Sequence, residues 1–170
     1  MKKSLYPSVI AAAVLWLSVV HADEPYAPKV EIPNNADPNS LAAMVVNAAK
    51  IPDKSEVEIP TYPGARVVQT KNTDGSGTSG ELPYIKLLST DPPDKVVAWY
   101  RSQLKGYTYE DVFGVAWVLW KGEGKFNGMD IRQRMAIQNV GISETMAAMG
   151  YDEFMKGAKS VIEVTYEPGQ

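Results

Sequence analysis

The 170-residue chain contains no cysteine and one histidine, His21. The absence of cysteine excludes disulfides, thiolate nucleophiles, cysteine-type zinc sites and covalent haem attachment. A lone histidine close to the N-terminus gives little support to a Ser-His-Asp arrangement or to imidazole acid–base chemistry. Arginine is scarce as well: four of the 17 basic residues are arginine, against 20 acidic residues, and the formal net charge is −3. This balance argues against binding to nucleic acid.

Nucleotide-binding motifs are missing too. The glycine-rich stretch 75–80 is not followed by lysine or by a helical pattern, so it predicts a loop and not a phosphate cradle. The sequence therefore implicates no cofactor, no metal ligand set and no catalytic residue. We expect a protein that is not an enzyme, and a carboxylate-based hydrolase is the alternative that stays open.

The N-terminal 22 residues have the layout of a secretory signal peptide. Lys2 and Lys3 are followed by the apolar run 9–20, and small residues flank His21 before Asp23. Twelve apolar residues are too few to cross a bilayer, which needs about 20. We expect cleavage after Ala22, export to the periplasm or medium, and no membrane span afterwards. The processed chain would carry a formal charge of −5, since Lys2 and Lys3 leave, and no histidine.

The remaining sequence predicts an extended leader over 23–39 and one α+β domain over 40–170. Helices are predicted over 40–50, 90–106 and 145–156, with a short helix favoured over a strand near 130–137. Strands are predicted over 66–70, 82–89, 113–121, 140–144 and 161–166. Because 113–121 is apolar at successive positions, it predicts a central strand covered on both faces. The sum is an antiparallel sheet of four to six strands with helices on one face.

Two motifs stand out in this order of elements. One is Tyr62-Pro63-Gly64-Ala65 before the first strand, and the other is Ser89-Thr90-Asp91 followed by a helix carrying Val96-Val97-Ala98-Trp99-Tyr100. They resemble a group of small exported bacterial proteins of unknown function, over 59–106, with Trp99 at a position where that group tends to have Phe. The resemblance implies an α+β fold and no catalytic residues.

Aromatic residues supply the main candidate for a binding site. Trp and Tyr combine flat apolar area with a polar tip, so a face built from them suits a sugar or small apolar ligand. The alternative is that the same residues form an ordinary packed core. The candidates are Tyr62, Tyr84, Trp99, Tyr100, Trp117 and Trp120.

Three further groups of side chains each have a functional and a simpler explanation. Several methionines, including Met146 and Met149, could bind Cu(I), but methionine is also a common core filler. Carboxylates at strand and helix ends could hydrolyse a glycosidic bond, but such positions are normal for solvated charges and caps. The basic residues Arg66, Lys125, Arg132 and Arg134 could hold an anion, or form a solvated face.

Three functions therefore remain open. The first is an exported, non-enzymatic domain that binds an unknown protein partner or takes part in envelope assembly. The second is a binder of a small apolar or sugar ligand, and the third is a carboxylate-based hydrolase acting on glycosides or cell wall. We favour them in this order.

Overall fold

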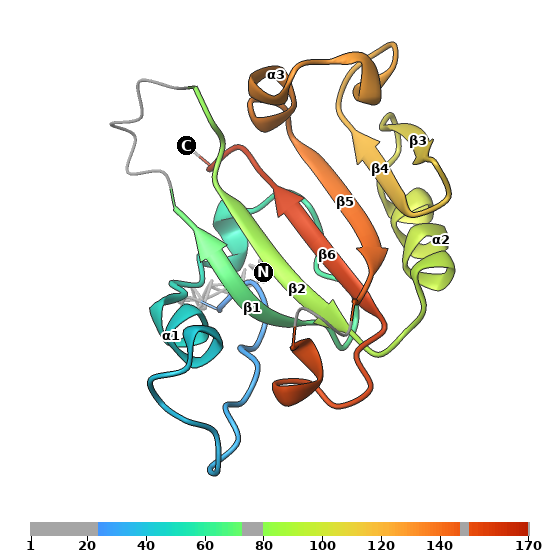
Figure 1. The fold of residues 1–170 in the computed structure, drawn as a ribbon. Helices are drawn as coiled ribbons and strands as arrows, with labels where there is room; N and C mark the ends of the chain where they lie inside the picture. The colour runs from blue at the N-terminus through green and yellow to red at the C-terminus, as the bar shows by residue number, and fades with distance from the viewer. Residues whose placement is uncertain (1–23, 73–79, 147–149, 170) are drawn as a thin grey trace, which may run out of the picture.

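The computed structural model describes residues 24–72, 80–146 and 150–169 of the chain. One six-stranded sheet organises them, with the strand order β1-β2-β6-β5-β4-β3 and every neighbouring pair antiparallel (Figure 1). The strands are β1 (Arg66–Lys71), β2 (Tyr84–Ser89), β3 (Thr108–Val112), β4 (Ala116–Trp120), β5 (Asn139–Glu144) and β6 (Ser160–Thr165). The predicted α+β class with an antiparallel sheet is confirmed.

The last strand in the sequence, β6, lies at the centre of the sheet. β6 lies between β2 and β5, and its residues Ile162 and Val164 are fully buried. Ile162 pairs with Leu87 on one side and with Ile142 on the other, so three branched apolar side chains share one face. This period-2 alternation is what the sequence 161–166 predicted.

Helix α2 (Pro93–Gln103) connects β2 to β3 at the far edge and covers the main core. Its buried residues Val96, Val97 and Tyr100 pack against the face that carries Ile162 and Val164. Leu104 and Gly106, which has a φ of 85°, end the helix near the predicted place. Pro92 occupies the N-cap position, and no side chain forms a capping hydrogen bond there.

Helix α1 (Leu41–Ala48) packs on the opposite face of the sheet, beside β1 (Figure 1). Val46 contributes there to a second core cluster with Val68 and Leu88. The two helices α1 and α2 therefore cover opposite faces of the sheet, whereas the sequence favoured helices on one face. Ser40 caps α1 by accepting a hydrogen bond from the backbone N–H of Ala43.

The apolar spacing within 40–50 predicts a stripe on α1 that includes Met44, and the buried side of the helix differs from it. Ala43, Val46 and Ala49 are buried, whereas Met44, which was expected to face the core, is 57% exposed. The buried positions are spaced three residues apart, so they lie on one side of the helix, and Met44 lies outside that side. Short helical turns complete the fold: Lys54–Glu56, Phe126–Gly128, α3 (Ile131–Met135) and Tyr151–Glu153.

Two predicted elements were wrong in extent. The predicted strand 113–121 begins only at Ala116, because residues 113–115 form the turn between β3 and β4. It is also next to the edge of the sheet and not central. The predicted helix 145–156 is, among the described residues, a single turn at Tyr151–Glu153 that follows Gly150 in the left-handed conformation. The helix expected at 130–137 is present as α3.

The leader contributes to the core. Tyr26, Ala27 and Val30 are buried, and a parallel bridge joins Lys29 to Val67 at the outer edge of β1. The backbone of Val30 donates to Val67, and the backbone of Val67 donates to Pro28. The predicted signal peptide and the first leader residue, Asp23, lie outside the described residues, as does most of the predicted glycine-rich loop.

Candidate functional site

The structure divides the six aromatic candidates into separate groups. Tyr62 contacts two aromatic residues of α2, Trp99 and Tyr100. The ring centroids are 5.3 Å apart for Tyr62–Trp99 and 4.8 Å apart for Trp99–Tyr100. Both contacts are edge-to-face, the geometry that aromatic quadrupoles favour. Tyr62 and Tyr100 are buried and Trp99 is partly exposed, so the three side chains form one wall of the core.

The other three aromatic candidates lie elsewhere. Trp117 is half-buried against the main core, whereas Trp120 is buried with Phe126 on the opposite face of the sheet. Tyr84 is on β2, where its hydroxyl accepts a hydrogen bond from the side-chain amide of Gln69. The six residues therefore do not line one pocket.

Asp91 joins the aromatic wall to the turn before α2. The Tyr62 hydroxyl donates to Asp91 Oδ2 at 2.8 Å, and the Lys95 ammonium lies 2.8 Å from Asp91 Oδ1. The hydrogen bond from Lys95, and after it the one from Tyr62, lowers the pKa of Asp91. The Ser160 hydroxyl donates to the Asp91 backbone carbonyl and so ties this turn to β6. Each polar atom in this network has a structural partner.

The tyrosines of the core titrate far from neutral pH. Burial raises the pKa of Tyr62, Tyr107 and Tyr166 to about 12, and it raises the pKa of Tyr26 and Tyr100 as well. A general acid or base works best with a pKa near the working pH. All these shifts, like that of Asp91, move the groups away from neutrality, which does not suit acid–base catalysis.

The candidate carboxylates and sulfurs also have ordinary surroundings. Glu110 accepts a hydrogen bond from the backbone of Asn127, and Asp111 accepts one from the backbone of Gly114. No group of three or more His, Cys, Asp or Glu side chains that could hold a metal ion occurs within 24–72, 80–146 and 150–169. Met146 is 58% exposed, whereas Met149 lies outside the described residues.

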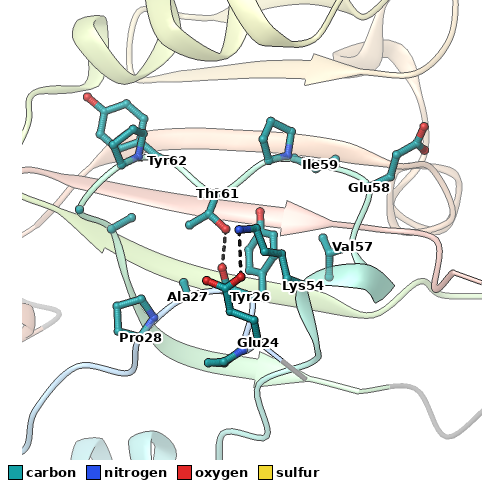
Figure 2. A pocket seen from close by; sticks show the side chains of 15 residues that line it. Glu24, Tyr26, Ala27, Pro28, Lys54, Val57, Glu58, Ile59, Thr61 and Tyr62 are labelled. Atoms are coloured by element: carbon teal, nitrogen blue, oxygen red, sulfur yellow. Dashed lines mark hydrogen bonds and ion pairs between the residues drawn. The ribbon is translucent and has the colours of Figure 1, made fainter. Parts of the chain in front are cut away.

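A groove of about 540 Å³ separates the leader from the segment 57–65 (Figure 2). An exposed ion pair between Lys54 and Glu24 and a hydrogen bond from the Thr61 hydroxyl to the Tyr26 carbonyl connect its two walls. Tyr62 is the one aromatic candidate that lines it. Its volume falls in the range of small-molecule sites, which is about 300–1,000 Å³.

The tip of the β3–β4 hairpin is the most unusual exposed feature. Phe113 is 84% exposed and has a φ of 58°, the one positive value at a described residue other than glycine. Gly114 follows with a φ of 69°, and the backbone N–H of Val115 donates to Val112. Positive φ at both central positions is the property of type I′ turns, which strongly prefer Asn-Gly or Asp-Gly. A phenylalanine at the first position is therefore strained as well as exposed.

Val115 extends this apolar tip, since its side chain is 66% exposed. The sequence pattern did not indicate this tip, because the apolar composition of residues 113–121 predicts one covered strand. The signal was available in Gly114, since a glycine inside an apolar strand pattern marks a turn, a bulge or a close approach. Phe113 and Val115 are thus the two most exposed large apolar side chains of the described residues, and they lie together at one tip.

No family model, no curated protein and no solved structure matches this chain. The resemblance to small exported bacterial proteins stays a prediction. Its two motifs do meet in space, through the hydrogen bond between Tyr62 and Asp91.

Proposed function

We propose that this chain is an exported, non-enzymatic domain that binds a protein partner through the tip of the β3–β4 hairpin. The observation that carries the proposal is Phe113, which combines a strained backbone with an aromatic ring left in water. Strained residues persist where the surrounding structure enforces them, and they concentrate at functional sites. Aromatic residues, Phe among them, are also enriched in protein interfaces relative to the rest of the surface.

The export half of the proposal rests on the signal-peptide pattern of residues 1–22. None of the helices within the described ranges is long and apolar enough to cross a membrane. The non-enzymatic half is supported by the absence of cysteine, by the single histidine, and by pKa shifts that move away from neutrality.

A capture experiment tests the proposal. The chain from Asp23 onward is immobilised and exposed to an envelope extract of its own organism, and retained proteins are identified and then rebound in purified form. We expect a partner whose binding to Phe113→Asn is lost and whose binding to Ile131→Asn is unchanged. Ile131 is a matched control because it is 61% exposed and lies on α3, away from the hairpin. Equal binding by both variants would remove the hairpin tip from the proposal.

The groove beside Tyr62 supports a second candidate, the binding of a small apolar or sugar ligand. Native mass spectrometry of the processed chain separates the two functions. A stoichiometric additional mass that is lost on substitution of a groove residue, such as Thr61→Trp, would favour the ligand.

A further inference from the structure

The outer edge of β3 is the second unusual feature of the same hairpin. β3 is the last strand of the sheet, and within the described part of the chain no strand or bridge pairs with its outer edge. The other sheet edge differs, because the leader bonds to both the backbone N–H and the backbone carbonyl of Val67 in β1. An unpaired edge presents backbone donors and acceptors to any extended chain, and proteins usually block it.

The charge on β3 restricts what can pair with it. Glu110 and Asp111 are consecutive, so their side chains point to opposite faces of the sheet. On the face of Tyr109, the guanidinium of Arg101 stacks on the tyrosine ring, 4.5 Å from its centroid. Neither carboxylate forms an ion pair within the described ranges. Both faces of this edge therefore carry an acidic group available to a partner.

A second copy of this chain does not suit the edge. Symmetric antiparallel pairing of two β3 strands about their centre places Glu110 opposite the same residue of the other copy. Like charges directly opposite each other destabilise a sheet. An extended segment with two consecutive basic residues has the opposite property, because it offers one cation to each face.

We infer that the partner adds an extended, basic strand to the outer edge of β3, while an apolar pocket beside that strand receives Phe113. The inference rests on the proposed function and names its partner's chemistry. Main-chain hydrogen bonds to β3 supply affinity in such an arrangement, and side chains at alternate positions supply specificity. Phe113 lies directly after Val112, the last residue of β3, so one partner segment can reach both features.

Synthetic peptides test the strand addition on the processed full chain. The probe is a labelled peptide of sequence Thr-Val-Lys-Lys-Val-Thr, and fluorescence anisotropy measures its binding. Its first control has Glu-Glu in place of Lys-Lys, and its second control has the Lys-Lys sequence with alternate backbone nitrogens methylated. We expect saturable binding of the probe and binding roughly tenfold weaker for each control. Hydrogen exchange should slow in residues 108–112.

Variants of the protein complete the test. Glu110→Gln and Asp111→Asn keep the oxygen that accepts from Asn127 or Gly114 but remove its charge, so the fold should persist. Together they should abolish the preference for the Lys-Lys peptide over the Glu-Glu peptide. The inference is overturned if the probe does not bind, if the methylated peptide binds equally well, or if protection appears in β1. Any of these results, combined with a captured partner that still depends on Phe113, would leave the proposed function standing.

Discussion

The Tyr62 hydroxyl donates a hydrogen bond to Asp91 Oδ2 at 2.8 Å, although the two residues are 29 positions apart in the chain. Tyr62 lies before β1, and Asp91 lies in the turn that leads from β2 into α2. The bond therefore fixes α2 over the main core at its first turn. Lys95 binds the other carboxylate oxygen and completes a three-residue network.

Because of this network, the stability of the folded state should decrease at acidic pH. The pKa of Asp91 is lowered from 3.8 in the folded state by Lys95 and then by Tyr62. Its contribution is consequently present above the unfolded pKa and is lost as the pH falls through the lower, folded pKa. Tyr62→Phe should lower the thermal midpoint at neutral pH and reduce the further fall below pH 3.8. Tyr84→Phe, which loses a contact to the uncharged Gln69, is the control. Parallel acid curves for wild type and Tyr62→Phe would contradict the prediction.

Because of the tyrosines of the core, stability should also decrease at alkaline pH. The pKa of Tyr62, Tyr107 and Tyr166 is raised from 10.0 to about 12. A raised folded pKa favours the folded state below the unfolded pKa, and the contribution is lost as the pH rises through the folded value. We expect unfolding between about pH 10 and 12, followed by phenolate absorbance and far-ultraviolet circular dichroism together. Phenolate absorbance that rises well before the loss of secondary structure would show that these rings ionise in the folded state.

The sequence predicted the sheet and the α2 region well because those signals are local. Alternation in 161–166 and the buried positions Val96, Val97 and Tyr100 follow from the periods of strand and helix. The turn at Phe113–Gly114 was missed because the apolar composition of 113–121 outweighed one glycine. The predicted aromatic face is not formed, for a simpler reason. Trp117 and Trp120 are three residues apart, so a single strand must place them on opposite faces. Contacts such as Tyr62 to Asp91 depend on tertiary packing, which no local pattern encodes.

The leader should be required for full stability. Tyr26 is 3% exposed and packs in the main core, so Tyr26→Ala should cost about 3–5 kcal/mol of unfolding free energy, as large-to-small core substitutions do. Lys54→Ala removes only the exposed ion pair to Glu24, and it should cost about 0–1 kcal/mol. Denaturant unfolding of the processed chain measures both. Similar losses for the two variants would mean that the ion pair, and not burial, holds the leader.

Gly122 should resist substitution because of Trp120. A Cβ at position 122 would lie 2.7 Å from Trp120 Cε3, and the indole is buried. Gly122→Ala should therefore cost about 1–3 kcal/mol, the usual range for overpacking. Gly128→Ala is the matched control, since its Cβ would meet only the Lys125 Cβ at 3.9 Å. Chemical denaturation of the two variants gives the comparison, and an equal effect on both would refute the steric argument.

Phe113 should lower the free energy of unfolding, although it contributes to partner binding. A left-handed conformation costs an L-residue roughly 1–2 kcal/mol, and Asn tolerates it well. Phe113→Asn should therefore raise the free energy of unfolding by about 1 kcal/mol. Val115→Asn removes a similarly exposed side chain from a residue without positive φ, so it should give no such gain. If Phe113→Asn stabilises the chain and also loses the captured partner, the cost in stability is explained by binding. If it destabilises the chain, the ring supports the hairpin itself, and the argument for a binding site at this tip fails.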